Sequence, residues 1–285
     1  MLTALDHIVL VCTDIETAVD DYTKLLGAQP VWRASDSDTA TAVFSFHNTA
    51  LELLAPAGDG AAADKLRTLV ADGARITTLV YRSDAITQDH HVVQRRGLKP
   101  SDITDGSSED LITGQSRQWQ RFRIPDDTMA GIKTFVVQPQ APLETVITRD
   151  DAVSALDHLV VQAPNIDRFV ANYGARLGLR LALDRRAPQW KTHFLFFRIG
   201  DCTIEATHRL DETHDVSGID KIWGLTWATG NLDAAHSRLG DAGIDVSEIR
   251  DGLKPGSRVF SVRSGTLGIP TLFIEHTPRQ SSDIG

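Results

Sequence analysis

The stretch LDHIVLV at residues 5–11 comes back as LDHLVV at residues 156–161, and this repeat organises the whole chain. His7 and His158 are 158 − 7 = 151 positions apart, which is more than half of the 285 residues. Each copy is followed by an amphipathic run that ends in Leu-Gly, at Gly27 and at Gly178. A repeat of this length predicts that the two halves of the chain share one fold.

Within each half, the order strand, helix, strand, strand, strand is predicted twice, which gives four βαβββ modules and an α+β fold class. A short helix at 61–72 and a polar loop at 106–114, with Gly106, Ser107 and Ser108, belong to the second module. Prolines at 139 and 142 block regular structure and mark a linker at 138–144. We therefore expect an N-terminal domain at 1–140 and a C-terminal domain at 150–280.

The composition limits the partners that the protein can bind. It has 41% hydrophobic and 24% charged residues, a net charge of −9 and a pI of about 5.5. This acidic balance argues against nucleic acid and anionic membranes as partners. No apolar run approaches the ~20 residues of a spanning helix, and no signal peptide is visible, so a cytoplasmic location is expected. Cys12 and Cys202 lie in apolar runs, which predicts buried thiols.

Equivalent positions in the four modules can be set side by side by the aspartates near their helix starts. This alignment places His7 opposite Thr77, His158 and Gly224 on the first strands. On the last strands it places Glu52, Glu205 and Glu275 at one position, where the second module has Val136. A histidine and a glutamate thus recur together in the first and third modules.

These motifs resemble the vicinal oxygen chelate superfamily, which includes glyoxalase I, extradiol dioxygenases and bleomycin resistance proteins. A Leu-Asp-His-Ile-Val first strand and an apolar-Glu last strand are typical of it. The resemblance implies that two modules close into a cupped mixed β-sheet around a divalent metal, with ligands from the first and last strands. The expected architecture is therefore glyoxalase-like, with the four modules paired into two cupped sheets.

Imidazole and carboxylate ligands suit zinc, iron, manganese or nickel. The C-terminal half offers His158, Glu205 and Glu275, and Gly224 leaves the fourth position open, so we predict one divalent ion there. The N-terminal half offers only His7 and Glu52, a weaker set. If modules one and three paired instead, His7, Glu52, His158 and Glu205 would form a four-ligand site. Adjacent modules usually pair, which favours the first arrangement.

Other side chains are candidates for a pocket in the C-terminal half. Trp190, Trp223, Thr226 and Trp227 are predicted to contact substrate, although tryptophans more often fill cores. His193 is a candidate general acid–base near neutral pH. Glu205 and Glu275 are also candidate catalytic bases, while His208 and His276 are expected at the rim.

By resemblance, the expected function is that of a metal-dependent lyase or isomerase acting on a small carbonyl or enediolate-forming substrate. The alternative is a metal-free protein that sequesters a small molecule, as bleomycin resistance proteins do. An extradiol dioxygenase is less favoured, because Gly224 removes one of the two histidines it would need. A small molecule is the predicted partner, with a homodimer as an option.

Overall fold

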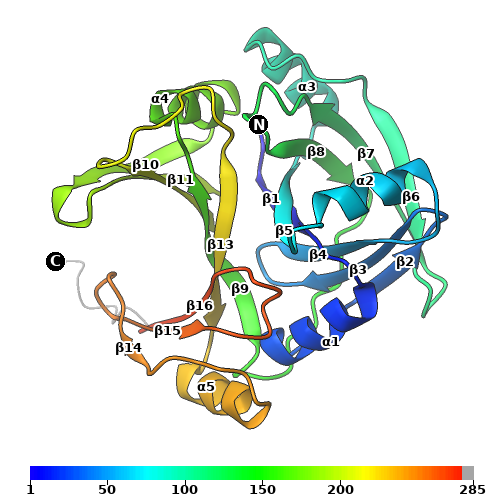
Figure 1. Cartoon of the computed structure of the whole chain (residues 1–285). Helices are drawn as coiled ribbons and strands as arrows, with labels where there is room; N and C mark the ends of the chain where they lie inside the picture. Colours follow the sequence, from blue (N-terminus) through cyan, green and yellow to red (C-terminus); the bar gives the residue numbers. More distant parts are fainter. Residues whose placement is uncertain (278–285) are drawn as a thin grey trace, which may run out of the picture.

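A computed structural model describes residues 1–277, and it contains two eight-stranded mixed sheets (Figure 1). The first sheet has the order β2-β3-β4-β1-β5-β8-β7-β6 and the second has the order β10-β11-β12-β9-β13-β16-β15-β14. The strands of the first are β1 (Ala4–Val11), β2 (Trp32–Ser35), β3 (Thr39–Ser45), β4 (Ala50–Pro56), β5 (Arg75–Arg82), β6 (Thr104–Glu109), β7 (Ser116–Ile124) and β8 (Lys133–Pro139). Those of the second are β9 (Val153–Gln162), β10 (Arg180–Ala187), β11 (Thr192–Ile199), β12 (Cys202–Arg209), β13 (Lys221–Thr229), β14 (Arg250–Asp251), β15 (Ser257–Val262) and β16 (Thr271–His276).

The pairing of the modules follows from these sheets. In the first sheet β1 runs parallel to β4 and antiparallel to β5, so modules one and two form one sheet. In the second sheet β9 has the same two relations with β12 and β13. The predicted pairing of one with two and three with four is confirmed, and the alternative pairing of one with three is wrong. Both sheets are curved, and their concave faces point away from each other (Figure 1).

Five α-helices of the described chain accompany the sheets: α1 (Ile15–Leu26), α2 (Ala61–Leu69), α3 (Ile86–Arg95), α4 (Ile166–Phe169, continued by a π-helix at Val170–Arg176) and α5 (Leu232–Asp241). A 3-10 helix at Pro188–Trp190 precedes β11. The predicted start and end of α1 are correct. Asp14 caps it by accepting a hydrogen bond from the Thr17 amide, and Gly27 ends it in the left-handed conformation. Within residues 1–277 no helix is long and apolar enough to cross a membrane.

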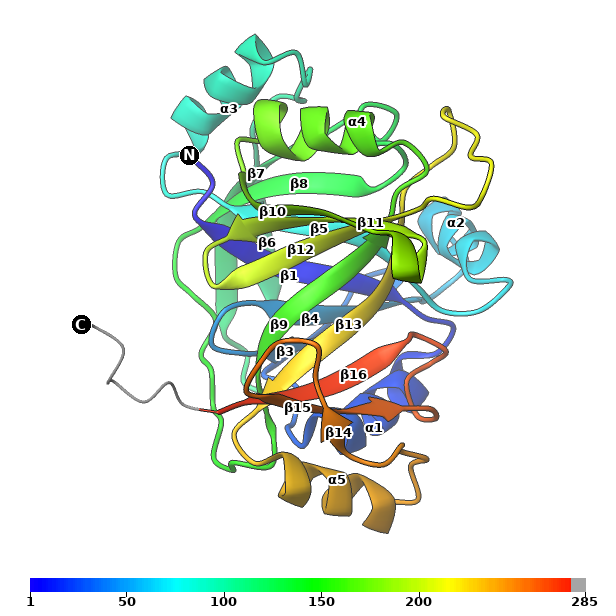
Figure 2. The same ribbon diagram turned by 90° about the vertical axis from the view of Figure 1, so that its left-hand side faces the viewer.

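One hydrophobic core joins the two halves. It contains Leu25 of α1 and Val93 of α3 from the first half, and Phe169 of α4 and Leu239 of α5 from the second. These four helices lie on the convex sides, outside the two cups (Figures 1 and 2). Helix α2 differs, because its Leu66 packs against Val9 and Val11 on the opposite face of β1. It therefore covers part of the N-terminal cup.

Three edge strands were missed by the prediction: the two-residue β14 and the longer β6 and β10. Residues 104–109, expected within a polar loop region, form strand β6 against β7. Strand β10 at 180–187 was not predicted, because its sequence is rich in arginine and most of its residues are exposed. Both are outer strands that are ordered by hydrogen bonds to an inner neighbour, so their sequences carry no apolar alternation.

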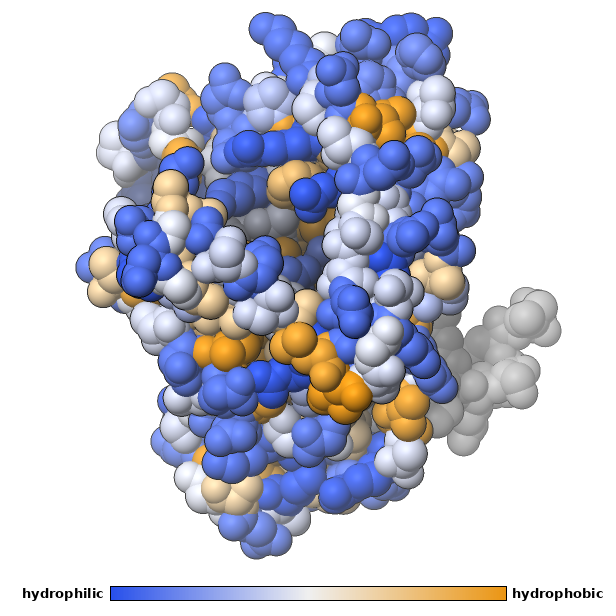
Figure 3. Space-filling model, turned by 90° about the vertical axis from the view of Figure 1, so that its right-hand side faces the viewer, coloured by the Kyte–Doolittle hydropathy of each residue, from blue (hydrophilic) through white to orange (hydrophobic). Residues whose placement is uncertain are grey.

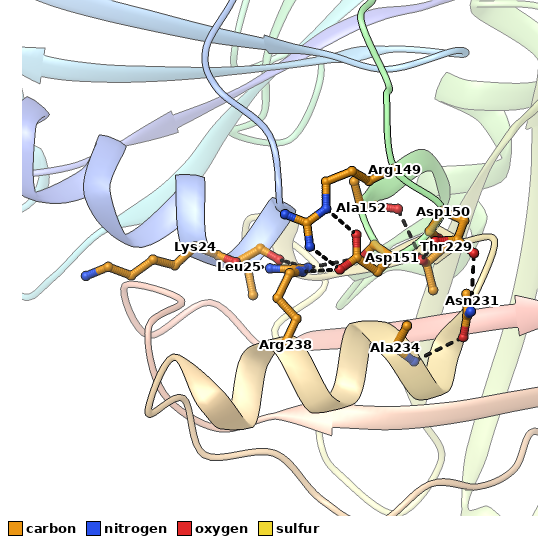
Figure 4. A network of polar contacts seen from close by, with 10 residues as sticks. All are labelled: Lys24, Leu25, Arg149, Asp150, Asp151, Ala152, Thr229, Asn231, Ala234 and Arg238. Atoms are coloured by element: carbon orange, nitrogen blue, oxygen red, sulfur yellow. Dashed lines mark hydrogen bonds and ion pairs between the residues drawn. The ribbon is translucent and has the colours of Figure 1, made fainter.

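The halves are also fastened by polar contacts around Arg238 of α5 (Figure 4). Its guanidinium donates to the carbonyls of Lys24 and Leu25 at the end of α1, and to the carbonyl of Asp151. A cation at a helix C-terminus also interacts favourably with the helix dipole. The Asp151 carboxylate lies 3.5 Å from Arg238 Nε and is bound by Arg149 as well.

Replacing Arg238 by methionine is expected to lower the free energy of unfolding by about 2 kcal/mol, because the carbonyl oxygens that accept from Arg238 would be left partly buried without a hydrogen-bond donor. Urea denaturation of both proteins measures this difference. The matched control is Arg263→Met, since the Arg263 side chain makes an exposed ion pair with Asp245. The control is expected to change stability by less than about 0.5 kcal/mol. Equal effects would show that the contacts of Arg238 contribute nothing beyond an ordinary surface arginine.

Candidate functional site

Two β-bulges position the histidines of the repeated motif. The pairing of β1 with β5 shifts between Leu5 and His7, and the pairing of β13 with β9 shifts where Asp157 lies. In a regular strand adjacent side chains point to opposite faces, whereas a bulge can turn two neighbours to the same face. Each aspartate therefore reaches the histidine that follows it. His7 Nδ1 lies 2.7 Å from Asp6 Oδ1, and His158 Nδ1 lies 2.7 Å from Asp157 Oδ1.

The predicted pairs of histidine and glutamate form in both cups. His7 Nε2 lies 3.3 Å from Glu52 Oε2, and His158 Nε2 lies 3.6 Å from Glu205 Oε2. The parallel pairing of the first and last strands of each module brings them together, because Glu52 lies two residues beyond the partner of His7. Each cup thus contains an Asp–His–Glu chain.

The structure corrects the position assigned to Gly224. Opposite His158 on β13 lies Thr226, whose hydroxyl is 2.9 Å from His158 Nε2. A Cβ at Gly224 would meet the Pro270 carbonyl at 2.7 Å, so close packing explains this glycine. Opposite His7 lies Val80, in place of Thr77. The observed partners lie 226 − 224 = 2 and 80 − 77 = 3 residues beyond the aligned positions, because alignment by helix starts does not give the register across the strands, which the bulges shift.

The predicted ligand set His158, Glu205 and Glu275 is not brought together. Glu275 lies on the helix-covered side of β16, where it accepts from the Leu232 amide at 3.3 Å and binds Arg258 at 2.6 Å. Its neighbour His276 points into the cup instead, and its Nε2 lies 2.5 Å from Asp157 Oδ2. His276 therefore belongs to the site rather than to its rim.

The other candidates of the C-terminal half are scattered. Trp227 is fully buried in the core and packs on Phe46 at a ring distance of 4.9 Å, so it does not contact a pocket. Trp190 and Trp223 are 41% and 48% exposed. His193 Nε2 lies 2.6 Å from Asp184, and strand alternation places it on the face opposite Phe194. Thr226, in contrast, lies within hydrogen-bonding distance of His158.

The N-terminal cup contains a denser set of charges. Arg82 binds Asp6 at 2.8 Å, and Arg117 of β7 lies close enough for the charges of Asp6, Glu52 and Arg82 to act on it. Burial would raise the pKa of Asp6, but His7 and Arg82 outweigh it and lower this pKa to about 2. Burial would lower the pKa of His7, but Asp6 and Glu52 outweigh it and raise this pKa. The site therefore favours an imidazolium held between two carboxylates.

The N-terminal sheet closes on itself, whereas the C-terminal sheet stays open. In the N-terminal sheet the two edge strands, β2 and β6, are joined by a hydrogen bond from Trp32 Nε1 to Ser108 Oγ at 3.0 Å. The Arg33 amide donates to Asp110 at 2.7 Å, and the Arg33 carbonyl accepts from the Leu111 amide. Among the residues described, no hydrogen bond joins β10 to β14, so the second cup lacks this closure (Figure 1).

A strap at residues 140–146 covers one end of the N-terminal cup, and its Leu143 packs against Trp32, Val43 and Ala50. Beneath it lies a cavity of about 730 Å³ lined by Trp32, Arg117, Gln115 and strap residues. The surface on this side is visibly hollowed (Figure 3). In the C-terminal cup Phe194 and Phe196 are half-exposed, and burial raises the pKa of Glu205. The sequence did not indicate this difference between the cups.

A divalent metal does not fit either donor set well. Catalytic sites of this kind use three protein ligands and one open position. Each cup pairs one imidazole nitrogen with one glutamate, and the aspartate beside each histidine binds its Nδ1. The C-terminal cup has a second imidazole, His276, but its Nε2 lies 2.5 Å from Asp157 Oδ2. Within the described chain no group of three or more His, Cys, Asp or Glu side chains is arranged to hold a metal ion.

The sequence matches two family models. Residues 5–151, more than half of the chain, match the glyoxalase-like domain, and residues 157–260 match the glyoxalase/bleomycin resistance protein/dioxygenase superfamily. The chain therefore belongs to this superfamily, as the repeated motif indicated. No sequence among curated proteins matches it significantly.

Solved structures of low sequence identity share the fold. A mutant of 4-hydroxymandelate synthase from Streptomyces coelicolor has a TM-score of 0.70 at 14% identity, over 96% of this chain and 92% of that one. The Mn(II)-bound glyoxalase from Novosphingobium aromaticivorans has 0.64 at 16%, over 96% and 82%. The 2,3-dioxygenase LapB from Pseudomonas sp. KL28 has 0.63 at 13%, over 100% and 97%. Their reactions differ, so the likeness supports the glyoxalase-like fold alone.

Proposed function

We propose that this protein binds a small oxygenated molecule in its N-terminal cup, and that binding needs no resident metal ion. The observation that carries the proposal is the closed cup with its cavity of about 730 Å³. Ligand pockets typically enclose about 300–1,000 Å³ and combine an apolar lining with a few oriented polar groups. Trp32 and Leu143 supply apolar lining. Arg117 also lines the cavity, and it lies close enough to the His7 site for the charges of Asp6 and Glu52 to act on it.

The polar groups suit recognition of oxygen atoms. Asp6 fixes the orientation of the His7 ring through Nδ1, which aims Nε2 toward the interior beside Glu52. An imidazolium N–H donates to a carbonyl or hydroxyl oxygen, and the Glu52 carboxylate accepts from a hydroxyl. A molecule with neighbouring carbonyl and hydroxyl groups would satisfy both.

A metal-dependent lyase or isomerase, the function expected from the sequence, needs a third protein ligand in one cup. Val80 lies opposite His7, and Thr226 lies opposite His158. These side chains give no imidazole or carboxylate. The further imidazole of the C-terminal cup, His276, is engaged by Asp157 at 2.5 Å, and no three donors within residues 1–277 are arranged to hold a metal ion. The donor chemistry therefore favours the metal-free binding alternative, and it moves the site from the C-terminal to the N-terminal cup.

The test uses full-length protein treated with EDTA and dialysed, together with a panel of small carbonyl, hydroxy and phenolic compounds, both neutral and charged. We expect at least one to raise the melting temperature, since a ligand at about 100 times its Kd adds about 2.7 kcal/mol of stability. Isothermal titration should give the same Kd after manganese or zinc is restored. Binding that appears only with added metal, or no binding across the panel, would contradict the proposal.

A further inference from the structure

We infer that the molecule bound in the N-terminal cup is an anion carrying a flat apolar group, and that Arg117 recognises its negative charge. This inference rests on the proposed function and names the chemical class of its ligand. It starts from one side chain whose donors the fold leaves unused inside the closed cup.

Arg117 is held in place by two aromatic rings. Its guanidinium carbon lies 5.3 Å from the ring centre of Trp32 on β2 and 5.9 Å from that of Trp119 on its own strand β7. These distances are typical of cation–π contacts. Because Trp32 comes from one edge of the sheet and Arg117 from near the other, the closure of the cup fixes the guanidinium across the cavity.

The hydrogen-bonding capacity of Arg117 is not used by the protein. Throughout residues 1–277 its side chain makes no ion pair and donates no hydrogen bond, although guanidinium has five N–H donors. Asp6 is occupied by His7 and Arg82, and Glu52 lies against His7. A partly buried charge without a partner is unfavourable, so an anion entering the cavity would gain a preorganised, bidentate contact.

The rest of the cavity suits the apolar part of such a molecule. Trp32, Leu143 and Val146 are apolar residues of the lining, and its three glutamines, Gln115, Gln118 and Gln140, are uncharged. Glu144 is the one acidic residue of the lining, and it is exposed to solvent. A planar ring can lie against the indole or the guanidinium plane, whereas a compact inorganic anion would leave this apolar surface uncovered.

The inference can be tested by isothermal titration of EDTA-treated full-length protein with benzoate, with its neutral analogue benzamide and with inorganic phosphate. We expect benzoate to bind at least ten-fold more tightly than benzamide, and phosphate to bind weakly. Arg117→Met should weaken benzoate binding about ten- to hundred-fold while leaving benzamide nearly unchanged, as loss of a charged hydrogen-bonding partner implies. Arg117→Lys should recover part of the loss.

Arg185→Met is the matched control, because Arg185 stacks on Trp190 at 5.4 Å in the open C-terminal half. It should not change benzoate affinity, and urea denaturation should show that both methionine variants fold. Equal affinity for benzoate and benzamide, unchanged benzoate binding in Arg117→Met, or no benzoate binding at millimolar concentration would overturn the inference. Neutral compounds that still bind the EDTA-treated protein would leave the proposed function standing, so the two failures are distinguishable.

Discussion

Replacing Trp227 by alanine is expected to lower the free energy of unfolding by about 4 kcal/mol. The side chain is fully buried and packs on Phe46, which comes from the other half of the chain. The cavity left behind would lie in the core that both sheets share. The whole chain should therefore lose stability in one step, which urea denaturation followed by fluorescence and by circular dichroism measures.

Trp223→Ala is the natural comparison, because this tryptophan lies on the same strand and is 48% exposed. We expect it to cost less than about 1 kcal/mol. A small loss for Trp227→Ala would mean that the two halves do not depend on this contact. Two separate transitions in that variant would likewise contradict a single shared core.

Replacing Asp6 by asparagine is expected to cost about 2–3 kcal/mol near pH 6, with a characteristic dependence on pH. Folding lowers the pKa of Asp6 from 3.8 to about 2, so its contribution is present above pH 4 and is lost as the pH falls toward 2. Folding raises the pKa of His7. The contribution of the protonated His7 to stability is therefore present at low pH and is lost as the pH rises through the folded-state pKa. The difference in stability between the wild type and Asp6→Asn should therefore increase as the pH falls from 8 to 6, and it should decrease as the pH falls below 4.

Urea denaturation of the wild type and Asp6→Asn across this range measures the difference. Asp20→Asn replaces an exposed aspartate on α1 and should give a small, nearly constant difference. A difference for Asp6→Asn that is independent of pH would show that the carboxylate does not interact with His7 and Arg82 as the structure indicates.

The fold could be predicted from the sequence because its main features are local and repeated. The recurring Leu-Asp-His stretch, the helix cap at Asp14 and the glycine at 27 each specify their own neighbourhood. The pairing of modules followed from short connections between sequence neighbours. Strand β6 was missed, because its order comes from β7 and not from an apolar pattern of its own.

The candidate site could be predicted only in part. Two pairs of histidine and glutamate were found, because parallel strands carry them at fixed offsets. The single-residue bulges at Asp6 and Asp157 were not visible, and they changed which residue faces each histidine. Because successive side chains of β16 point to opposite faces, His276 lies in the cup where Glu275 was predicted, and Glu275 lies on the helix-covered side. Closure of the N-terminal cup depends on contacts such as Trp32 with Ser108, 76 positions apart, which no local pattern specifies.

The two cups allow the central claim to be tested by one measurement on matched variants. A compound that binds the wild type in the panel is titrated calorimetrically into EDTA-treated His7→Gln and His158→Gln. These substitutions remove the same imidazole from equivalent positions of the two sheets. We predict one binding site per chain in the wild type, a loss of at least ten-fold in affinity in His7→Gln, and unchanged binding in His158→Gln. Binding that survives in His7→Gln and disappears in His158→Gln would place the ligand in the open C-terminal cup and contradict the account.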